Sequence, residues 1–199
     1  MNRRRRTLWL FVFLILATLS SSAATGEPVC PASMEEQRKM PRQITTEIEI
    51  AAPAEIVWDI LLEFERYPEW NPFVREISGE PIPDGRLTIV VQPPGGSAMT
   101  FQPRVLKAEA PRELRWLGKL FLPRIFDGEH SFVLDPLGEN RVRLTHSECF
   151  RGLLVPMLWK GLDTATRAGF EELNQALKAR AEGRFTAASG EDAGRQGTE

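Results

Sequence analysis

Two histidines and a glutamate are the side chains of this sequence best suited to acid–base chemistry. In the stretch 141–150, apolar residues hold even positions and polar residues most odd positions, the period-2 pattern of a strand with one buried face. His146 and Glu148 are even-numbered, so this register predicts that both point inward. The same parity predicts that Cys149 points outward and is not a nucleophile in the interior.

The second histidine, His130, lies on the preceding predicted strand. His130 and Phe132 share one face of that strand, and a hairpin turn near Gly138 would place His130 beside His146 and Glu148. Because the sequence contains 2 histidines, both would then lie in one apolar chamber.

A carboxyl group and two imidazole rings in such a chamber need partners, since each unsatisfied polar group costs about 1–3 kcal/mol. Three interpretations remain open: a self-contained packing pair, recognition of one oxygen of a bound molecule, or a general acid and base. The candidates for catalysis are His146, Glu148 and His130. No metal site is predicted, because strand spacing does not indicate three donors converging at about 2 Å from one point. No cofactor is predicted either.

Large apolar side chains complete the predicted cavity. Leu114, Trp116 and Gly118 alternate with Arg115, Leu117 and Lys119, so Trp116 should point inward. Phe101 belongs to a similar apolar file with Met99 and Val105, interrupted by Pro103. Core packing also explains these side chains, and apolar residues in such files more often belong to the core than to a pocket. The predicted ligand-binding residues are Trp116, His130, Phe132, Leu144, His146, Glu148, Phe150, Leu158, Leu162 and Phe101.

The surrounding pattern predicts an α+β domain over residues 41–183. A strand over 44–50 is followed by a helix that begins after Pro53, and about six more strands separated by turn residues occupy 73–150. A long amphipathic helix after Gly152 should end near Gly183 and cover one face of the antiparallel sheet.

The two ends of the chain differ from this domain. Residues 1–24 combine four arginines, an apolar run and small residues, which is typical of a signal peptide, so the protein should be exported to the periplasm or outside the cell. The alternative is an uncleaved inner-membrane anchor through residues 8–19. Residues 25–40 should form a flexible linker and 184–199 a disordered polar tail. An oxidising compartment would permit a disulfide between Cys30 and Cys149, and two unpaired thiols fit the sequence as well.

Composition and motifs exclude several functions. The formal charge of -2 gives no reason to expect a nucleic acid partner. The sequence has no Gly-x-Ser-x-Gly, phosphate-binding glycine loop, Cys-x-x-Cys or His-Glu-x-x-His motif, which removes support for most enzyme classes.

Local sequence resembles one known superfamily. Residues 50–59 (IAAPAEIVWD) and 67–73 (YPEWNPF) are close to the opening signature of the START-like, or polyketide cyclase/dehydrase, superfamily, and LRW at 114–116 and HSECF at 146–150 recur in its bacterial members. The resemblance covers about 140 residues and implies a helix-grip fold, in which a curved sheet of about seven strands wraps around the last helix. In such proteins the space between sheet and helix holds a sterol, lipid, polyketide or other apolar ligand. The signature builds structure and does not define function.

Three functions therefore remain open. The first, which we favour, is binding or carriage of an apolar small molecule. The second is a cofactor-free cyclase or dehydratase, and the third is a stress or assembly factor with a vestigial cavity. The apolar stretch 153–159 is either a cavity gate that makes transient membrane contact or ordinary packing.

Overall fold

The computed structural model of this 199-residue chain describes residues 42–120 and 124–195. The predicted α+β class is confirmed. In chain order the elements are β1 (Arg42–Ile50), α1 (Ala54–Leu62), a 3-10 turn η2 (Phe64–Arg66), α2 (Tyr67–Trp70), β2 (Val74–Gly79), β3 (Leu87–Val91), β4 (Met99–Phe101), β5 (Arg104–Glu109), β6 (Glu113–Leu120), β7 (Phe126–Gly138), β8 (Arg141–Arg151) and α3 (Val155–Arg195). The predicted signal segment 1–24 and linker 25–40 lie outside the described residues.

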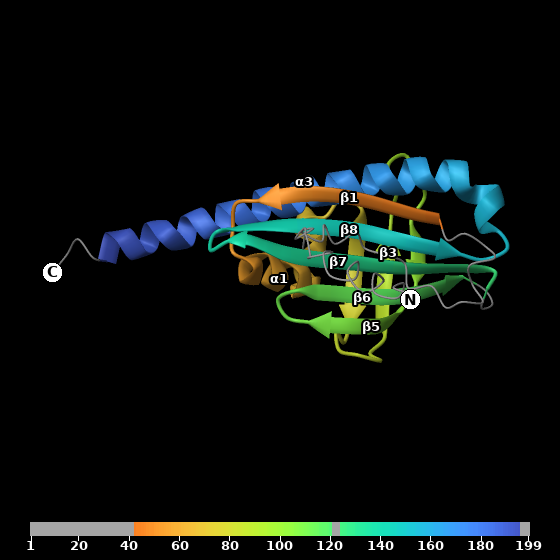
Figure 1. Cartoon of the computed structure of the whole chain (residues 1–199), viewed down its shortest axis with the longest axis horizontal. Helices are drawn as coiled ribbons and strands as arrows, with labels where there is room; N and C mark the ends of the chain where they lie inside the picture. The colour runs from red at the N-terminus through yellow and green to blue at the C-terminus, as the bar shows by residue number, and fades with distance from the viewer. Residues whose placement is uncertain (1–41, 121–123, 196–199) are drawn as a thin grey trace, which may run out of the picture.

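The strands form two antiparallel sets. One has the order β1-β8-β7-β6-β5 and the other β2-β3-β4. Backbone hydrogen bonds join the sets where Val105 N donates to Gly85 O at 2.8 Å and Leu87 N donates to Pro103 O at 2.9 Å. In Figure 1 the larger set runs along the long axis of the molecule and β3 crosses behind it. The result is a strongly bent sheet of the helix-grip type, as predicted.

The single strand expected to carry Met99, Phe101 and Val105 is two strands. Met99 and Phe101 belong to β4 in the smaller set, whereas Val105 belongs to β5 in the larger set. Pro103 lies between them, and proline cannot donate to a strand ladder, which explains why the pairing changes at this point.

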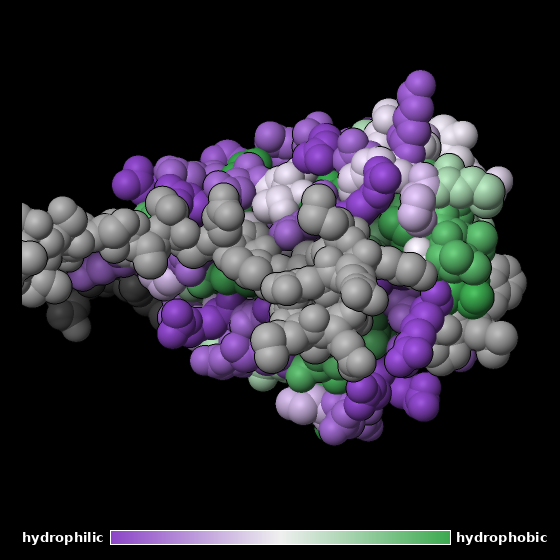
Figure 2. Space-filling view, turned by 45° about the vertical axis from the view of Figure 1, so that its right-hand side comes forward, coloured by the Kyte–Doolittle hydropathy of each residue, from purple (hydrophilic) through white to green (hydrophobic). Residues whose placement is uncertain are grey.

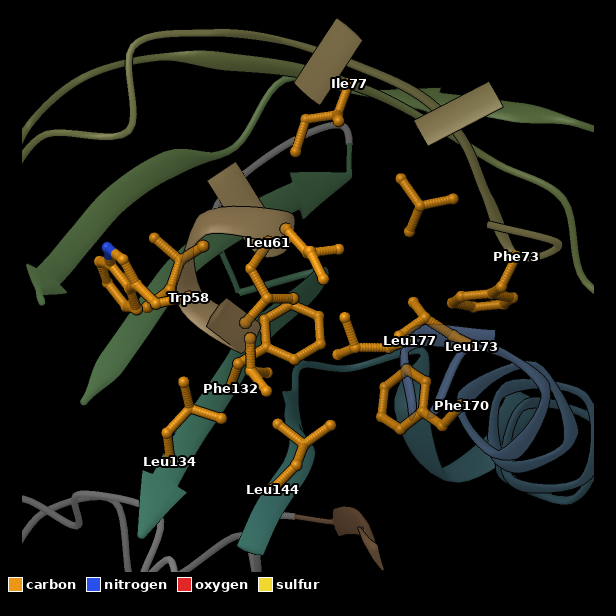
Figure 3. Close-up of a cluster of buried hydrophobic side chains, with 14 of the residues drawn as sticks. Trp58, Leu61, Phe73, Ile77, Phe132, Leu134, Leu144, Phe170, Leu173 and Leu177 are labelled. Carbon is orange, nitrogen blue, oxygen red and sulfur yellow. The ribbon is translucent and has the colours of Figure 1, made fainter. Parts of the chain in front are cut away.

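Helix α3 packs along the sheet. Its apolar side chains recur at helical spacing, and Figure 3 shows Leu173 and Leu177 directed toward Leu61 of α1 and toward Phe132 and Leu144 of the sheet. All five side chains are buried. This part of the interior is therefore filled by side chains, and a cavity must lie elsewhere.

The end of α3 differs from the prediction. The helix does not stop near Gly183 but continues to Arg195, so the tail expected to be disordered over 184–199 is helical as far as the structure describes it. A glycine inside a helix costs only about 1 kcal/mol relative to alanine. Phe185 packs against the core and Arg184 contacts Glu63, so tertiary contacts continue past Gly183.

Candidate functional site

A cavity of about 310 Å³ lies between the sheet and the first half of α3. It lies between the two strand sets, toward the end of the interior where β8 ends and α3 begins. Its walls are mostly apolar, and His130 and Glu148 are among the few polar side chains on them. The lining residues are Phe73, Val74, Ile89, Val91, Pro93, Met99, Phe101, Pro103, Trp116, Gly118, Lys119, Phe126, Gly128, His130, Glu148, Phe150, Leu158, Leu162, Ala165 and Thr166.

Two glycines on adjacent strands help to create this space. Gly118 of β6 is paired with Gly128 of β7, and both line the cavity. A Cβ at Gly118 would meet no atom closer than 3.8 Å, whereas a Cβ at Gly128 would lie 2.4 Å from Glu148 Oε1. Gly118 therefore leaves cavity volume open, and Gly128 leaves room for the carboxyl group. Neither glycine is among the residues predicted to line the cavity.

Seven of the predicted ligand-binding residues line the cavity and three do not. Those on the wall are Phe101, Trp116, His130, Glu148, Phe150, Leu158 and Leu162. Phe132, Leu144 and His146 do not line the cavity and lie in the filled part of the interior. The His146 ring is stacked between Phe132, at 4.4 Å between ring centres, and Phe170, at 3.6 Å. Parity placed all three on the correct face but could not show where α3 closes against the sheet.

The predicted hairpin brings His130 and Glu148 directly opposite one another on β7 and β8. His130 Nδ1 lies 3.7 Å from Glu148 Oε2, which is too long for a direct hydrogen bond. Trp116 stacks on one face of the imidazole, at 4.6 Å between ring centres and with the ring planes 6° from parallel. The ring of His130 is therefore held in place while its Nδ1 faces the carboxyl group.

A chain of hydrogen bonds runs from the Nε2 atom of His130 through His146 and Asn174 to Thr46. His130 Nε2 lies 3.0 Å from His146 Nε2, and His146 Nδ1 lies 2.9 Å from Asn174 Oδ1. Asn174 Nδ2 donates to Thr46 Oγ1 at 2.9 Å. His146 has both ring nitrogens satisfied, so it acts as a support for His130 and not as a cavity residue.

Asn174 is the member of this network that the sequence analysis missed. It lies on the buried face of α3 next to Leu173 and is only 2 % exposed. A polar residue on the apolar face of an amphipathic helix is a signal that it has a buried partner. The sequence could supply that signal, but it could not identify a partner 28 positions away on β8.

Burial favours the neutral form of each of the three titratable groups. Loss of solvation lowers the pKa of His130 to about 3 and raises the pKa of Glu148 to about 8. The pKa of His146 is also lowered, first by burial and then by the neighbouring His130, against a smaller opposing effect of Asn174. At neutral pH the site therefore contains a neutral carboxyl group and two neutral imidazoles.

Glu148 differs from the histidines in its bonding. Its side chain is 19 % exposed, it lines the cavity, and it receives no hydrogen bond from the described residues. A largely buried carboxyl group without a hydrogen bond is costly. Its donor and acceptor capacity is therefore available to a molecule in the cavity.

Exposed apolar side chains lie beside the cavity, in the stretch where the sequence suggested a gate. Leu158 lines the cavity and is 43 % exposed, and Met157 and Leu153 nearby are 74 % and 65 % exposed. Met99, from β4, is 48 % exposed and also lines the cavity. Figure 2, which brings the right-hand side of Figure 1 forward, shows hydrophobic surface at that end of the molecule.

Among residues 42–120 and 124–195, no three His, Cys, Asp or Glu side chains are arranged to hold a metal ion. No helix within these ranges is long and apolar enough to cross a membrane. Cys149 is on the outer face of β8, is buried and is disulfide-bonded, and Cys30 lies outside the described residues.

A bent antiparallel sheet gripping a long C-terminal helix, with an apolar cavity between them, defines the START-like class. The chain belongs to the polyketide cyclase/dehydrase and lipid transport family, which matches residues 41–182. No curated protein sequence matches it.

Solved structures share the fold at low sequence identity. The Zhui aromatase/cyclase from a Streptomyces species is 18% identical with a TM-score of 0.63, over 75% of this chain and 98% of that one. A START superfamily protein from Mycobacterium smegmatis is 24% identical with a TM-score of 0.56, over 70% and 97%. The di-domain aromatase/cyclase StfQ of the steffimycin pathway is 18% identical with a TM-score of 0.61, over 75% of this chain, which spans 53% of that protein.

Proposed function

We propose that this protein binds and carries an apolar small molecule, such as a lipid or polyketide, and holds one polar group of it at Glu148 and His130. The observation that carries the proposal is the Glu148 carboxyl group, which faces an apolar cavity without a hydrogen bond from the described residues. An apolar pocket with a few converging polar groups is the usual form of a small-molecule site, since the walls provide affinity and the polar groups fix orientation.

The proposed site of action is the cell envelope, outside the inner membrane. The N-terminal sequence pattern supports export, and the exposed Leu153, Met157 and Leu158 offer an apolar surface for transient membrane contact beside the cavity. A carrier loads and unloads apolar cargo, which is easier when its opening contacts an apolar phase.

Filling the cavity tests the proposal. Titration with the neutral fluorescent probe N-phenyl-1-naphthylamine should show binding by the wild-type protein. Gly118→Leu should weaken that binding at least about tenfold, because Gly118 lines the cavity and its Cβ would meet no atom closer than 3.8 Å, so the larger side chain should occupy cavity volume. Gly161→Leu on the exposed surface of α3 is the matched control and should bind like the wild type. Equal probe affinity of the two variants would contradict the proposal.

The second candidate is a cofactor-free cyclase or dehydratase. It is favoured by the 3.7 Å approach of Glu148 to His130, since a neutral carboxyl group can donate a proton and an imidazole can accept one. Dehydration of an aromatic β-hydroxyketone, followed by the absorbance of the conjugated enone, would detect such activity. Glu148→Gln should then abolish turnover while probe binding persists, whereas absence of turnover in the wild type would leave only the binding function.

A further inference from the structure

We infer that Asn174 is a specificity-determining residue: acting through His146, it makes the cavity-facing nitrogen of His130 a hydrogen-bond acceptor, so that the site selects ligands bearing a hydroxyl group. The inference rests on the proposed binding function and deepens it by naming the chemical class of the ligand.

The first step is the orientation of the Asn174 amide. The Thr46 hydroxyl lies 3.4 Å from the His146 carbonyl oxygen and donates to it, which leaves the Thr46 lone pairs for the Asn174 Nδ2 donor at 2.9 Å. The Asn174 Oδ1 atom therefore faces His146 Nδ1, at 2.9 Å. Because an amide oxygen only accepts, His146 must carry its proton on Nδ1.

The tautomer of His146 in turn determines which ring nitrogen of His130 carries the proton. A neutral imidazole has one N–H, so His146 Nε2 is an acceptor and the His130 Nε2 atom, 3.0 Å away, must donate to it. His130 is then unprotonated at Nδ1, the nitrogen that faces Glu148 and the cavity. Burial, which lowers the pKa of both histidines, keeps them in these neutral forms at physiological pH.

The third step is the geometry that remains for a ligand. His130 Nδ1 and Glu148 Oε2 are 3.7 Å apart, so a single oxygen atom can lie at about 2.8 Å from both. A hydroxyl oxygen can donate its proton to Nδ1 and accept one from the neutral carboxyl group of Glu148. An ether or ketone oxygen cannot donate, and it would face the lone pair of Nδ1 without a hydrogen bond between them.

Nitrogen NMR of the unliganded full-length protein tests the tautomers directly. With 2 histidines in the chain, ¹⁵N–¹H correlation through the ring protons gives two easily assigned patterns. The expected result is an Nδ1–H tautomer for His146 and an Nε2–H tautomer for His130. An Nδ1–H tautomer for His130 would overturn the inference, and this measurement needs no variant to fold.

Two probes of matched shape test the selection. Calorimetric titration should show that 2-naphthol binds about tenfold more tightly than 2-methoxynaphthalene, which keeps the ring and the oxygen but lacks the donor. Asn174→Leu removes the acceptor for His146 and should reduce this ratio to about threefold or less, with a mixture of histidine tautomers in the NMR spectrum. Asn174→Asp restores an acceptor at the same place and should restore the Nδ1–H form of His146.

Gln175→Leu is the matched control, because Gln175 is exposed and makes no contact with His146 in the described hydrogen-bond network. It should leave the probe ratio and the tautomers unchanged. Equal binding of both probes to the wild type would overturn the hydroxyl selection while leaving ligand binding intact. Binding of neither probe would contradict the proposed function, and the inference would fail with it.

Discussion

Glu148 should make the stability of this protein fall as the pH rises above the ordinary range of a carboxyl group. Burial raises its pKa from 4.5 to about 8 in the folded protein. Between these values the folded state holds a proton that the unfolded chain has lost, so its contribution to stability is complete below pH 4.5 and disappears as the pH rises through 8. Replacing the group by glutamine removes the titration and keeps the shape.

The size of the effect follows from the shift. Each pH unit in this window changes the free energy of unfolding by about 1.4 kcal/mol, so the wild type should lose up to about 2 kcal/mol between pH 6 and pH 8 on account of Glu148. Water that enters the cavity would reduce this figure by solvating the carboxylate. The two histidines act in the opposite sense: their pKa values are lowered, so their contribution is lost as the pH falls below 6.5. Together the three groups predict a stability maximum near pH 6.5.

Urea unfolding followed by tryptophan fluorescence at pH 6, 7 and 8 would measure this. Comparing the wild type with Glu148→Gln cancels the histidine contributions, which the two proteins share. Glu139→Gln, at an exposed position in the turn between β7 and β8, controls for loss of a surface carboxyl group. If the wild type and Glu148→Gln lose stability equally between pH 6 and pH 8, the assignment of Glu148 as a buried neutral acid is refuted.

Two further predictions concern α3. Gly169→Ala should lower the free energy of unfolding by about 1–3 kcal/mol, because the new Cβ would lie 2.1 Å from the Phe73 ring. Gly161→Ala should raise the free energy of unfolding by up to about 1 kcal/mol, because nothing lies within 4 Å of its Cβ. Chemical denaturation would compare the two variants, and equal effects would contradict close packing at Gly169. Truncation after Gly183 removes the partly buried Phe185 and should lower the free energy of unfolding by about 1–2 kcal/mol. An unchanged melting curve would show that the part of α3 after Gly183 does not contribute to the stability of the domain.

The sequence predicted the parts of this site that depend on alternation along a strand. Parity alone placed His146 and Glu148 on the inner face, and the hairpin placed His130 opposite Glu148, because antiparallel register is set by the turn and by the buried face. Periodicity also identified α3 as the covering helix.

The sequence could not predict where α3 packs directly against the sheet and where it leaves a cavity. Strand parity is a local property, whereas the boundary between cavity and core depends on which turn of α3 meets which strand. For that reason Phe132, Leu144 and His146 share a face with Glu148 but lie in filled core, where the His146 ring stacks on Phe170. The length of α3 was missed for a related reason, since contacts with other elements support the segment after Gly183.

A packing role explains His146 but not Glu148. His146 is fully buried and has both ring nitrogens hydrogen-bonded, so it needs no ligand to be satisfied. Glu148 has no such partner among the described residues, and its raised pKa means that it lowers the stability of the fold at neutral pH compared with an unperturbed carboxyl group. Gly128 leaves the space that the carboxyl group occupies, so two positions on facing strands jointly maintain a group that weakens the fold. A destabilising titratable group that faces a cavity is a signal of function more than of architecture, which is why we place the recognition of the ligand at Glu148 and His130 and assign His146 a supporting role.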